Sequence, residues 1–214
     1  NTINATPEYL ENITAFVSEE VGIAFTQADD LFDATQNVDG FVRVSAAIKT
    51  AAVNLSKMSN DLRLLSSGPK AGIGEINLPA KQNGSSIMPG KVNPVIPEVV
   101  SQVAFRVIGN DLTITMAAES GQLELNAFEP IIFHSLFESI DCLTHAVATL
   151  TANCITGIQA NEMICYKQVE ESAGIATALC PTIGYQKASA IAKESLETGK
   201  TVRELVLEKG LLTI

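Results

Sequence analysis

The chain has 214 residues, a formal net charge of −10 at pH 7, 46% hydrophobic residues and 18% charged residues. The acidic balance argues against nucleic-acid binding, which requires a basic face. The sequence contains no run of about 18 uncharged apolar residues, so a membrane span is not expected. The charged fraction lies below the roughly 25% that is typical of soluble domains, so we expect much helix surface to be buried against other chains.

Helical patterns fill the first part of the chain. Thr6 and Pro7 predict a helix start, because threonine is a good N-cap and proline suits the first helical position; the helix is expected over 7–21. A second, long helix is expected over about 39–66, where apolar residues recur three and four positions apart. Its buried stripe is predicted to be Ile48, Ala51, Ala52, Leu55, Met58, Leu62 and Leu65.

The stretch 67–93 interrupts the helical pattern. Its 27 residues include five glycines and three prolines and show no sustained periodicity. A short extended piece is expected at Glu75–Leu78. So long an irregular stretch inside a helical domain is unusual unless it is functional or disordered.

Helical patterns then resume and become shorter toward the end of the chain. A helix is expected over about 94–119, with Pro94 and Pro97 in its first turns, where a missing N–H matters little. Another is expected over 129–154, with Ile132, Leu136, Ile140, Leu143, Val147 and Leu150 facing inward. Shorter helices are expected at about 161–172, 182–197 and 201–208.

The predicted fold is therefore all-α, a bundle of long helices followed by a small helical domain. We place the boundary near 155–161, which gives domains at 1–158 and 159–214. Long apolar-striped helices cannot all bury their faces within one chain of this size, so packing with copies of the same chain is expected.

The strongest functional signal is residues 84–94, which read Gly-Ser-Ser-Ile-Met-Pro-Gly-Lys-Val-Asn-Pro. Hydroxyls, an amide, one cation and many backbone N–H groups suit a loop that closes over a small, multiply negative ligand. Removing a proton next to a carboxylate creates an enediolate, which requires a base and strong stabilisation of the new charge. A serine is a poor base unless the same donors stabilise its alkoxide.

This string resembles the signature of the aspartase/fumarase superfamily, whose members eliminate a group beta to a carboxylate and form a fumarate unit. The likeness covers nearly all of the chain and includes Asn60-Asp61-Leu62-Arg63, Gly109-Asn110-Asp111 and Gly199-Lys200-Thr201-Val202-Arg203. It implies that 1–158 is the C-terminal part of the central helical-bundle domain and that 159–214 begins an incomplete C-terminal domain. We expect the chain, which starts at Asn1, to be a piece of a longer protein.

The resemblance assigns roles to the site residues. It implies that Ser85 is the catalytic base, that Ser86 is a supporting donor, and that Lys91 and Asn93 hold the substrate carboxylates. It also implies that Glu98 orients and charges a histidine from another part of the protein. A single loop serine or asparagine is usually solvated or caps a helix, and a first-turn glutamate is favoured by the helix dipole, but the set at the family spacing favours function.

The partner histidine of Glu98 is not expected within this chain. His134 and His145 do not lie in a segment that matches the family's histidine motif, so we interpret both as structural or surface residues. That motif and the threonine- and serine-containing substrate segments are expected upstream of Asn1. Asn4 aligns only weakly with the end of one of them. These 214 residues alone are therefore expected to be inactive.

Within the superfamily, Pro97-Glu98 and the segment 122–126 (Gln-Leu-Glu-Leu-Asn) resemble aspartate ammonia-lyases, whereas class II fumarases more often carry Thr-Gln after the same Asn-Pro. The resemblance thus implies reversible elimination of ammonia from L-aspartate to give fumarate. Class II fumarase activity is the alternative. Argininosuccinate and adenylosuccinate lyases share the loop but diverge outside it. A non-catalytic helical assembly module also stays open.

The expected partners are a small dicarboxylate substrate, L-aspartate or fumarate, and further copies of the chain. The resemblance implies a homotetramer in which loops of three subunits build each site. No nucleic acid, membrane or cofactor is expected. The four cysteines form no Cys-x-x-Cys pair, so we interpret them as reduced core thiols of a cytoplasmic protein rather than metal ligands.

Overall fold

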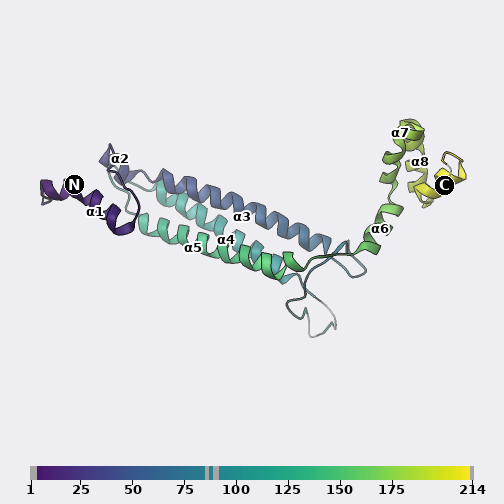
Figure 1. Cartoon of the computed structure of the whole chain (residues 1–214), viewed down its shortest axis with the longest axis horizontal. Helices are drawn as coiled ribbons and strands as arrows, with labels where there is room; N and C mark the ends of the chain where they lie inside the picture. Colours follow the sequence, from purple (N-terminus) through teal and green to yellow (C-terminus); the bar gives the residue numbers. More distant parts are fainter. Residues whose placement is uncertain (1–3, 85–86, 89–91, 213–214) are drawn as a thin grey trace. The chain divides into compact units, whose positions relative to one another are not determined.

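The computed structural model describes residues 4–84, 87–88 and 92–212. These residues are mostly helical, which confirms the all-α prediction (Figure 1). They divide into two compact units, one made of the residues up to Ala51 with Arg106–Asp141, the other of Ala52–Phe105 with the residues from Cys142 onward. The predicted domain boundary near 155–161 stays a prediction. No helix of the described residues is long and apolar enough to cross a membrane.

The first unit begins with helix α1 (Pro7–Val21), whose bounds were predicted. The hydroxyl of Thr6 accepts a hydrogen bond from the backbone N–H of Tyr9, and Gly22 ends the helix with a φ of 72°, a conformation that glycine adopts easily. Helix α2 (Leu31–Gln36) was not predicted, because six residues carry less than two turns of periodicity.

The long helices α3 (Asp39–Leu65), α4 (Val95–Glu119) and α5 (Glu129–Asn153) agree with their predicted ranges to within one residue at each end. In the first unit, parts of all three lie side by side (Figure 1). Their core consists of Val38, Ile114, Ala117, Ile132 and Leu136. This contact confirms long-helix packing as the architecture of the chain.

Buried polar groups also connect these helices in the first unit. Asp111 is 6% exposed and accepts hydrogen bonds from Ser45 at 2.8 Å and Lys49 at 2.5 Å, which joins α4 to α3. The side-chain amide of Asn110 donates to Oε2 of Glu138 at 2.7 Å and to Oγ of Ser139 at 3.0 Å, which joins α4 to α5. Because buried polar groups require partners, these bonds favour one register of the helices.

Glu138 provides a pH-dependent contribution to this packing. The hydrogen bond from Asn110 holds the pKa of Glu138 below its ordinary value of 4.5; partial burial opposes the shift, and the hydrogen bond and charge of Arg106 add to it. A carboxylate with a lowered folded pKa stabilises the fold above its unfolded pKa and loses that contribution as the pH falls through the folded pKa.

We therefore expect Glu138→Gln to lower the melting temperature near neutral pH, and the difference from the wild type to shrink as the pH falls below 4.5 and through the lowered folded pKa of Glu138. Thermal unfolding followed by circular dichroism measures this difference. The same substitution at exposed Glu19 controls for the change in net charge. Melting temperatures of wild type and Glu138→Gln that ran parallel over the whole range would contradict the expectation.

The second unit has its own core between the remaining parts of α3, α4 and α5. It is built on Val100, Ala146, Leu150 and Cys154, with Leu55, Leu62, Leu78, Ile96 and Val103 packed against it. All four cysteines are free, and burial raises the pKa of the Cys154 thiol.

The predicted inward faces were partly wrong. Met58, which was expected in the core, is 48% exposed, and Ile140 and Val147 on α5 are 42% and 41% exposed. The face of α3 that packs inside the chain carries small residues instead, namely Ser45, Ala52, Ser56 and Ser59. Small side chains let helices approach closely, so Leu55 and Leu62 pack only partly buried against the core, and Met58 lies outside the contact.

A short sheet connects two distant stretches of the second unit. Strand β1 (Ile76–Asn77) lies in the extended piece that was predicted, and it pairs antiparallel with strand β2 (Gln159–Ala160), which was not. The backbone N–H of Asn161 donates to the carbonyl of Glu75 at 2.8 Å. The amide of Gln168 reaches the carbonyl of Ile73 at 2.9 Å. The stretch before the predicted loop is thereby fixed to residues 159–168.

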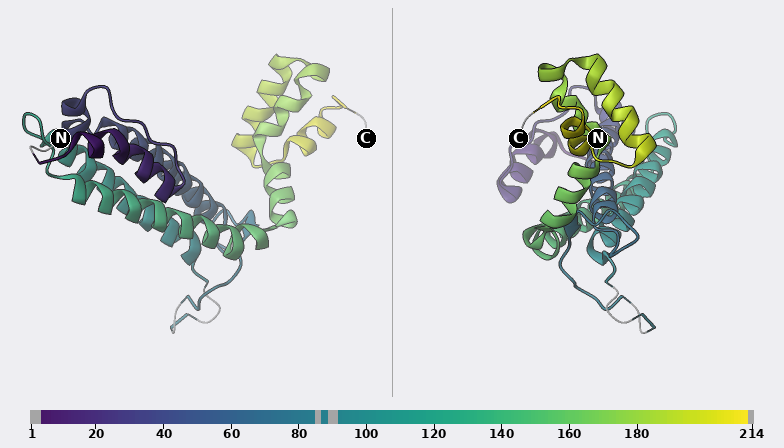
Figure 2. Two further views of the ribbon diagram at one scale, coloured as in Figure 1. Left: turned by 60° about the vertical axis from the view of Figure 1, so that its left-hand side comes forward. Right: turned by 90° about the vertical axis from the view of Figure 1, so that its right-hand side faces the viewer.

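The last part of the chain folds into short helices with a separate core (Figure 2). After the 3₁₀ turn η1 (Ile155–Gly157) come α6 (Glu162–Glu171), the 3₁₀ helix η2 (Ala173–Leu179), α7 (Cys180–Ile183), α8 (Tyr185–Thr198) and α9 (Val202–Glu208). The core contains Ala176, Ile191, Val202, Leu205 and Val206. Thr201 and Glu204 form a reciprocal capping box that starts α9.

Candidate functional site

The two ends of the predicted loop meet at the start of α4. Asn83 and Val92 form an antiparallel bridge, and the side-chain amide of Asn93 donates to the carbonyl of Gly84 at 3.3 Å. The carbonyl of Asn93 accepts from the backbone N–H of Val95 at 2.9 Å. Asn93 thus closes the base of the loop and joins it directly to the first turn of α4.

The tip of the loop carries most of the predicted site residues. Ser85, Ser86 and Lys91 lie outside the described residues, so their roles as base, supporting donor and carboxylate ligand stay predictions, as does closure of the loop over a ligand. Between them, Ile87 is 86% exposed and Met88 is 51% exposed. The structure therefore describes the two ends of the loop, and Ser85 directly follows Gly84 in the chain.

Glu98 lies in the first turn of α4, five positions after Asn93. Its backbone N–H donates to the carbonyl of Pro94 at 3.1 Å, which starts the helix. Its side chain is 37% exposed, and its Oε1 lies 3.7 Å from Nη2 of Arg63, near the C-terminal end of α3. The structure thus brings Asn93 and Glu98 to the same end of α4 and leaves the Glu98 carboxylate accessible.

The histidines of the chain are exposed on α5, in agreement with the prediction that they are structural or surface residues. His134 lies near Glu138 and contributes to the lowered pKa of that carboxyl. Asn4, the weakly aligned residue, lines a hollow of about 680 Å³ with residues of α1 and with Gln27 and Leu31. That hollow belongs to the first unit, whereas Asn93 and Glu98 belong to the second.

Arg63 is the residue near the site to which sequence analysis gave no role. Arg63 belongs to the Asn-Asp-Leu-Arg string that resembles the superfamily, so the sequence indicated its motif but not its contact with Glu98. The contact joins residues 35 positions apart and depends on how α3 and α4 pack. Periodicity alone does not predict such a contact.

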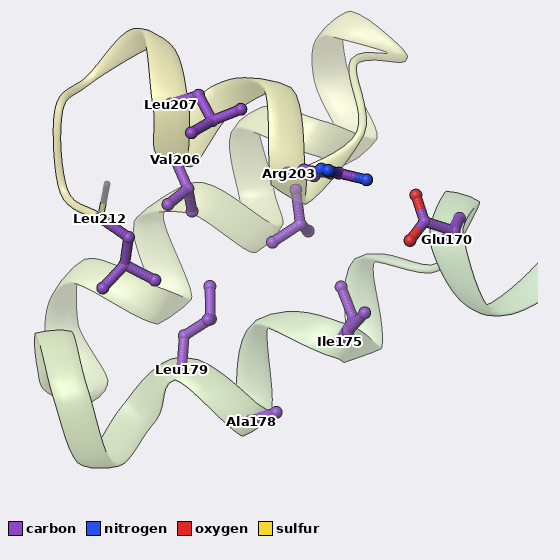
Figure 3. A pocket seen from close by; sticks show the side chains of 9 residues that line it. Glu170, Ile175, Ala178, Leu179, Arg203, Val206, Leu207 and Leu212 are labelled. Carbon is purple, nitrogen blue, oxygen red and sulfur yellow. The ribbon is translucent and has the colours of Figure 1, made fainter. Parts of the chain in front are cut away.

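A separate cavity of about 400 Å³ lies among the C-terminal helices (Figure 3). Its walls are mostly apolar, and the side chains of Arg203 and Glu170 point toward one another at one side of it. None of the predicted site residues that the structure describes lines this cavity. Within residues 4–84, 87–88 and 92–212, no group of three or more His, Cys, Asp or Glu side chains could hold a metal ion.

The sequence profile of a family described as "Lyase" matches residues 1–109, which is half of the chain. The chain belongs to the lyase family. A second profile, described as "Fumarase C C-terminus", matches residues 175–214 and thus the C-terminal helices of the chain. Together the two matches confirm the predicted aspartase/fumarase superfamily.

Relatives within the lyase family are identical to this chain at about half of the aligned positions. The aspartate ammonia-lyase of Helicobacter pylori is 55% identical over 211 residues, which cover 99% of this chain and 45% of that protein. The aspartate ammonia-lyase of Bacillus subtilis is 49% identical over 211 residues, or 99% of this chain and 44% of that protein. The chain therefore spans less than half the length of these relatives.

Solved structures of the same family confirm the fold. A fumarate lyase/delta crystallin from Brucella melitensis superposes with a TM-score of 0.90 at 52% identity, covering 97% of this chain and 45% of that one. The class II fumarase of Schistosoma mansoni gives a TM-score of 0.87 at 32% identity, covering 98% of this chain and 47% of that one.

Proposed function

We propose that the protein containing this chain is an ammonia-lyase that reversibly eliminates ammonia from L-aspartate to give fumarate. The observation that carries this proposal is the 49–55% identity, over nearly the whole chain, to proteins named aspartate ammonia-lyase. Pro97-Glu98 after the loop supports the same branch of the family. Ser85, Lys91 and Asn93 support a catalytic rather than a purely structural role, since an abandoned site has no need for all three.

In the proposed reaction, Ser85 acts as an alkoxide that the donors of the loop stabilise; it takes the proton from the carbon next to the distal carboxylate and becomes a hydroxyl. The electron pair of that C–H bond moves into the carboxylate as an enediolate. Lys91 and Asn93 hold the substrate carboxylates, and Ser86 supports them as a donor. The enediolate then collapses to the double bond of fumarate as the C–N bond breaks and ammonia leaves. The donors act chiefly on the enediolate, where charge is greatest.

The described geometry is compatible with these roles. The side-chain amide of Asn93 has two N–H groups, and only one is needed for the carbonyl of Gly84. The other could donate to a carboxylate above the loop base. Glu98 is accessible at the same end of α4, where it could orient a histidine supplied by another part of the protein and stabilise its charged form.

The alternative function is that of a class II fumarase, because the Schistosoma mansoni enzyme shares the fold and 32% of its residues with this chain. A direct assay separates the two. The full-length protein is expected to form fumarate from L-aspartate, followed by ultraviolet absorbance and ammonia release, and not from L-malate. Fumarate from malate alone would establish the alternative, and no turnover of either substrate would favour a non-catalytic assembly module. The 214-residue chain alone is expected to be inactive.

We further propose that the protein is cytoplasmic, because its four cysteines are free. We also propose that it is a homotetramer, assembled through α3, α4 and α5. Large apolar side chains are exposed along all three helices. They are Val44, Val53, Met58 and Leu64 on α3, Val99, Phe105, Ile108, Leu112 and Met116 on α4, and Ile131, Phe137, Ile140 and Val147 on α5. Apolar surface of this extent favours association.

Assembly is tested by placing a charge on the exposed face of α4. Leu112 is 63% exposed, so Leu112→Lys should leave the fold of one chain intact but place an ammonium in the proposed interface, where it is costly to bury. We expect light scattering at micromolar concentration to report a lower mass than for the wild type. Leu196→Lys on α8, at a residue 79% exposed, is the matched control. A wild-type chain that is monomeric under these conditions would refute the packing proposal.

A further inference from the structure

The Asn60-Asp61-Leu62-Arg63 string at the end of α3 contains none of the proposed catalytic residues, yet it contacts one of them. Nη1 of Arg63 donates to Oδ1 of Asn60 at 3.3 Å. Nη2 of the same guanidinium lies 3.7 Å from Oε1 of Glu98. One planar group therefore contacts an amide on its own helix and a carboxylate on the first turn of α4.

The fold fixes the separation of the two helix ends. Leu62, next to Arg63, and Ile96, two positions before Glu98, both pack against the core of the second unit. Since these neighbours are held by the core, the backbones of Arg63 and Glu98 cannot drift apart independently. The approach of the two side chains is therefore set by helix packing rather than by the side chains alone.

Glu98 needs such a restraint if it is to orient another side chain. Its side chain is 37% exposed, and an exposed glutamate samples several rotamers, of which only some could face an imidazole. A guanidinium with a fixed, planar set of donors restricts that choice more than a flexible ammonium does. The contact of Arg63 with Asn60 restrains the guanidinium in turn.

We propose that Arg63 is a positioning residue, which holds the carboxylate of Glu98 in the orientation that pairs it with the histidine expected from another part of the protein. This inference rests on the proposed function. Because the side chains of the pair are 42% and 37% exposed, their attraction adds little to the stability of the fold. Loss of Arg63 should therefore reduce turnover and leave thermal stability nearly unchanged.

The test is a double-mutant cycle in the full-length protein that contains this chain, with L-aspartate as substrate. Arg63→Met is expected to lower kcat about three- to tenfold and to change KM for L-aspartate by less than about twofold. In the Glu98→Gln background the same substitution is expected to have no further effect, because Arg63 acts through that carboxylate. The kcat of Arg63→Lys should lie between those of the wild type and Arg63→Met, since lysine retains the charge without the forked guanidinium.

The control is Arg43→Met on the same helix, where Arg43 pairs with Asp39 at 3.2 Å; kcat should not change. Equal losses from Arg63→Met in the wild-type and Glu98→Gln backgrounds would show a merely structural role and overturn the inference. An active wild type with fully active Arg63→Met would overturn the inference alone. A wild type that forms no fumarate from aspartate would overturn the proposed function as well. If Arg63→Met does not fold, Arg63→Lys takes its place in the cycle.

Discussion

Replacing Ser85 by alanine in the full-length protein is expected to lower kcat for aspartate by about 10²- to 10⁴-fold, which is the usual range for loss of a general base. KM should change much less, because the alkoxide of Ser85 accepts a proton in the transition state and is not a carboxylate ligand in the ground state. Steady-state kinetics with aspartate, followed by fumarate absorbance, measures both constants.

The neighbouring serine provides a matched control for this prediction. Ser86→Ala removes the same atom one position along the loop, and as a supporting donor it should reduce turnover less than Ser85→Ala. A Ser85→Ala protein with near-native turnover would show that the base is a different group. A larger loss from Ser86→Ala would show that the two roles are reversed.

Lys91 should affect both binding and rate, since a substrate carboxylate is charged before the reaction and gains charge during it. Hydrogen bonds to charged groups contribute about 1.5–3 kcal/mol, so Lys91→Met is expected to lower kcat/KM for aspartate by about 10- to 150-fold. Lys91→Arg should not restore activity, because the forked guanidinium needs more room and approaches a carboxylate differently.

Lys81 is the matched control for Lys91. It is an exposed lysine just before the loop, so Lys81→Met alters the charge of the same stretch without removing a proposed ligand. Its kcat/KM should stay close to the wild-type value. Full activity in Lys91→Arg would show that any nearby positive charge suffices, and it would remove the specific role of the ammonium.

The long helices could be predicted from the sequence because their signals are local and extended. Pro94 directly precedes α4 and Pro97 lies in its first turn, and the apolar spacing of α3, α4 and α5 persists for many turns. The inward face was harder to predict, since apolar periodicity marks a face without saying what covers it. Met58 shows this difference, for it continues the apolar stripe of α3 and is exposed in the single chain.

Short elements and long-range contacts could not be predicted in the same way. Helix α2 and strand β2 contain too few residues to show a period. The roles of Ser85, Ser86, Lys91, Asn93 and Glu98 follow from the family resemblance of their spacing and stay predictions. The contact of Glu98 with Arg63 appears only once α3 and α4 are packed together.

The pairing of β1 with β2 also affects how the protein is made. Ile76 pairs with Ala160, so the stretch before the loop must wait for 84 further residues before its backbone partners exist. At typical translation speeds of about 5–20 residues per second, this delay is roughly 4 to 17 seconds. During that interval the exposed N–H and C=O groups of β1 could pair with another nascent chain. A stop or pause before Gln159 would therefore leave the stretch before the loop without its strand partner, even with the helices α3, α4 and α5 already synthesised.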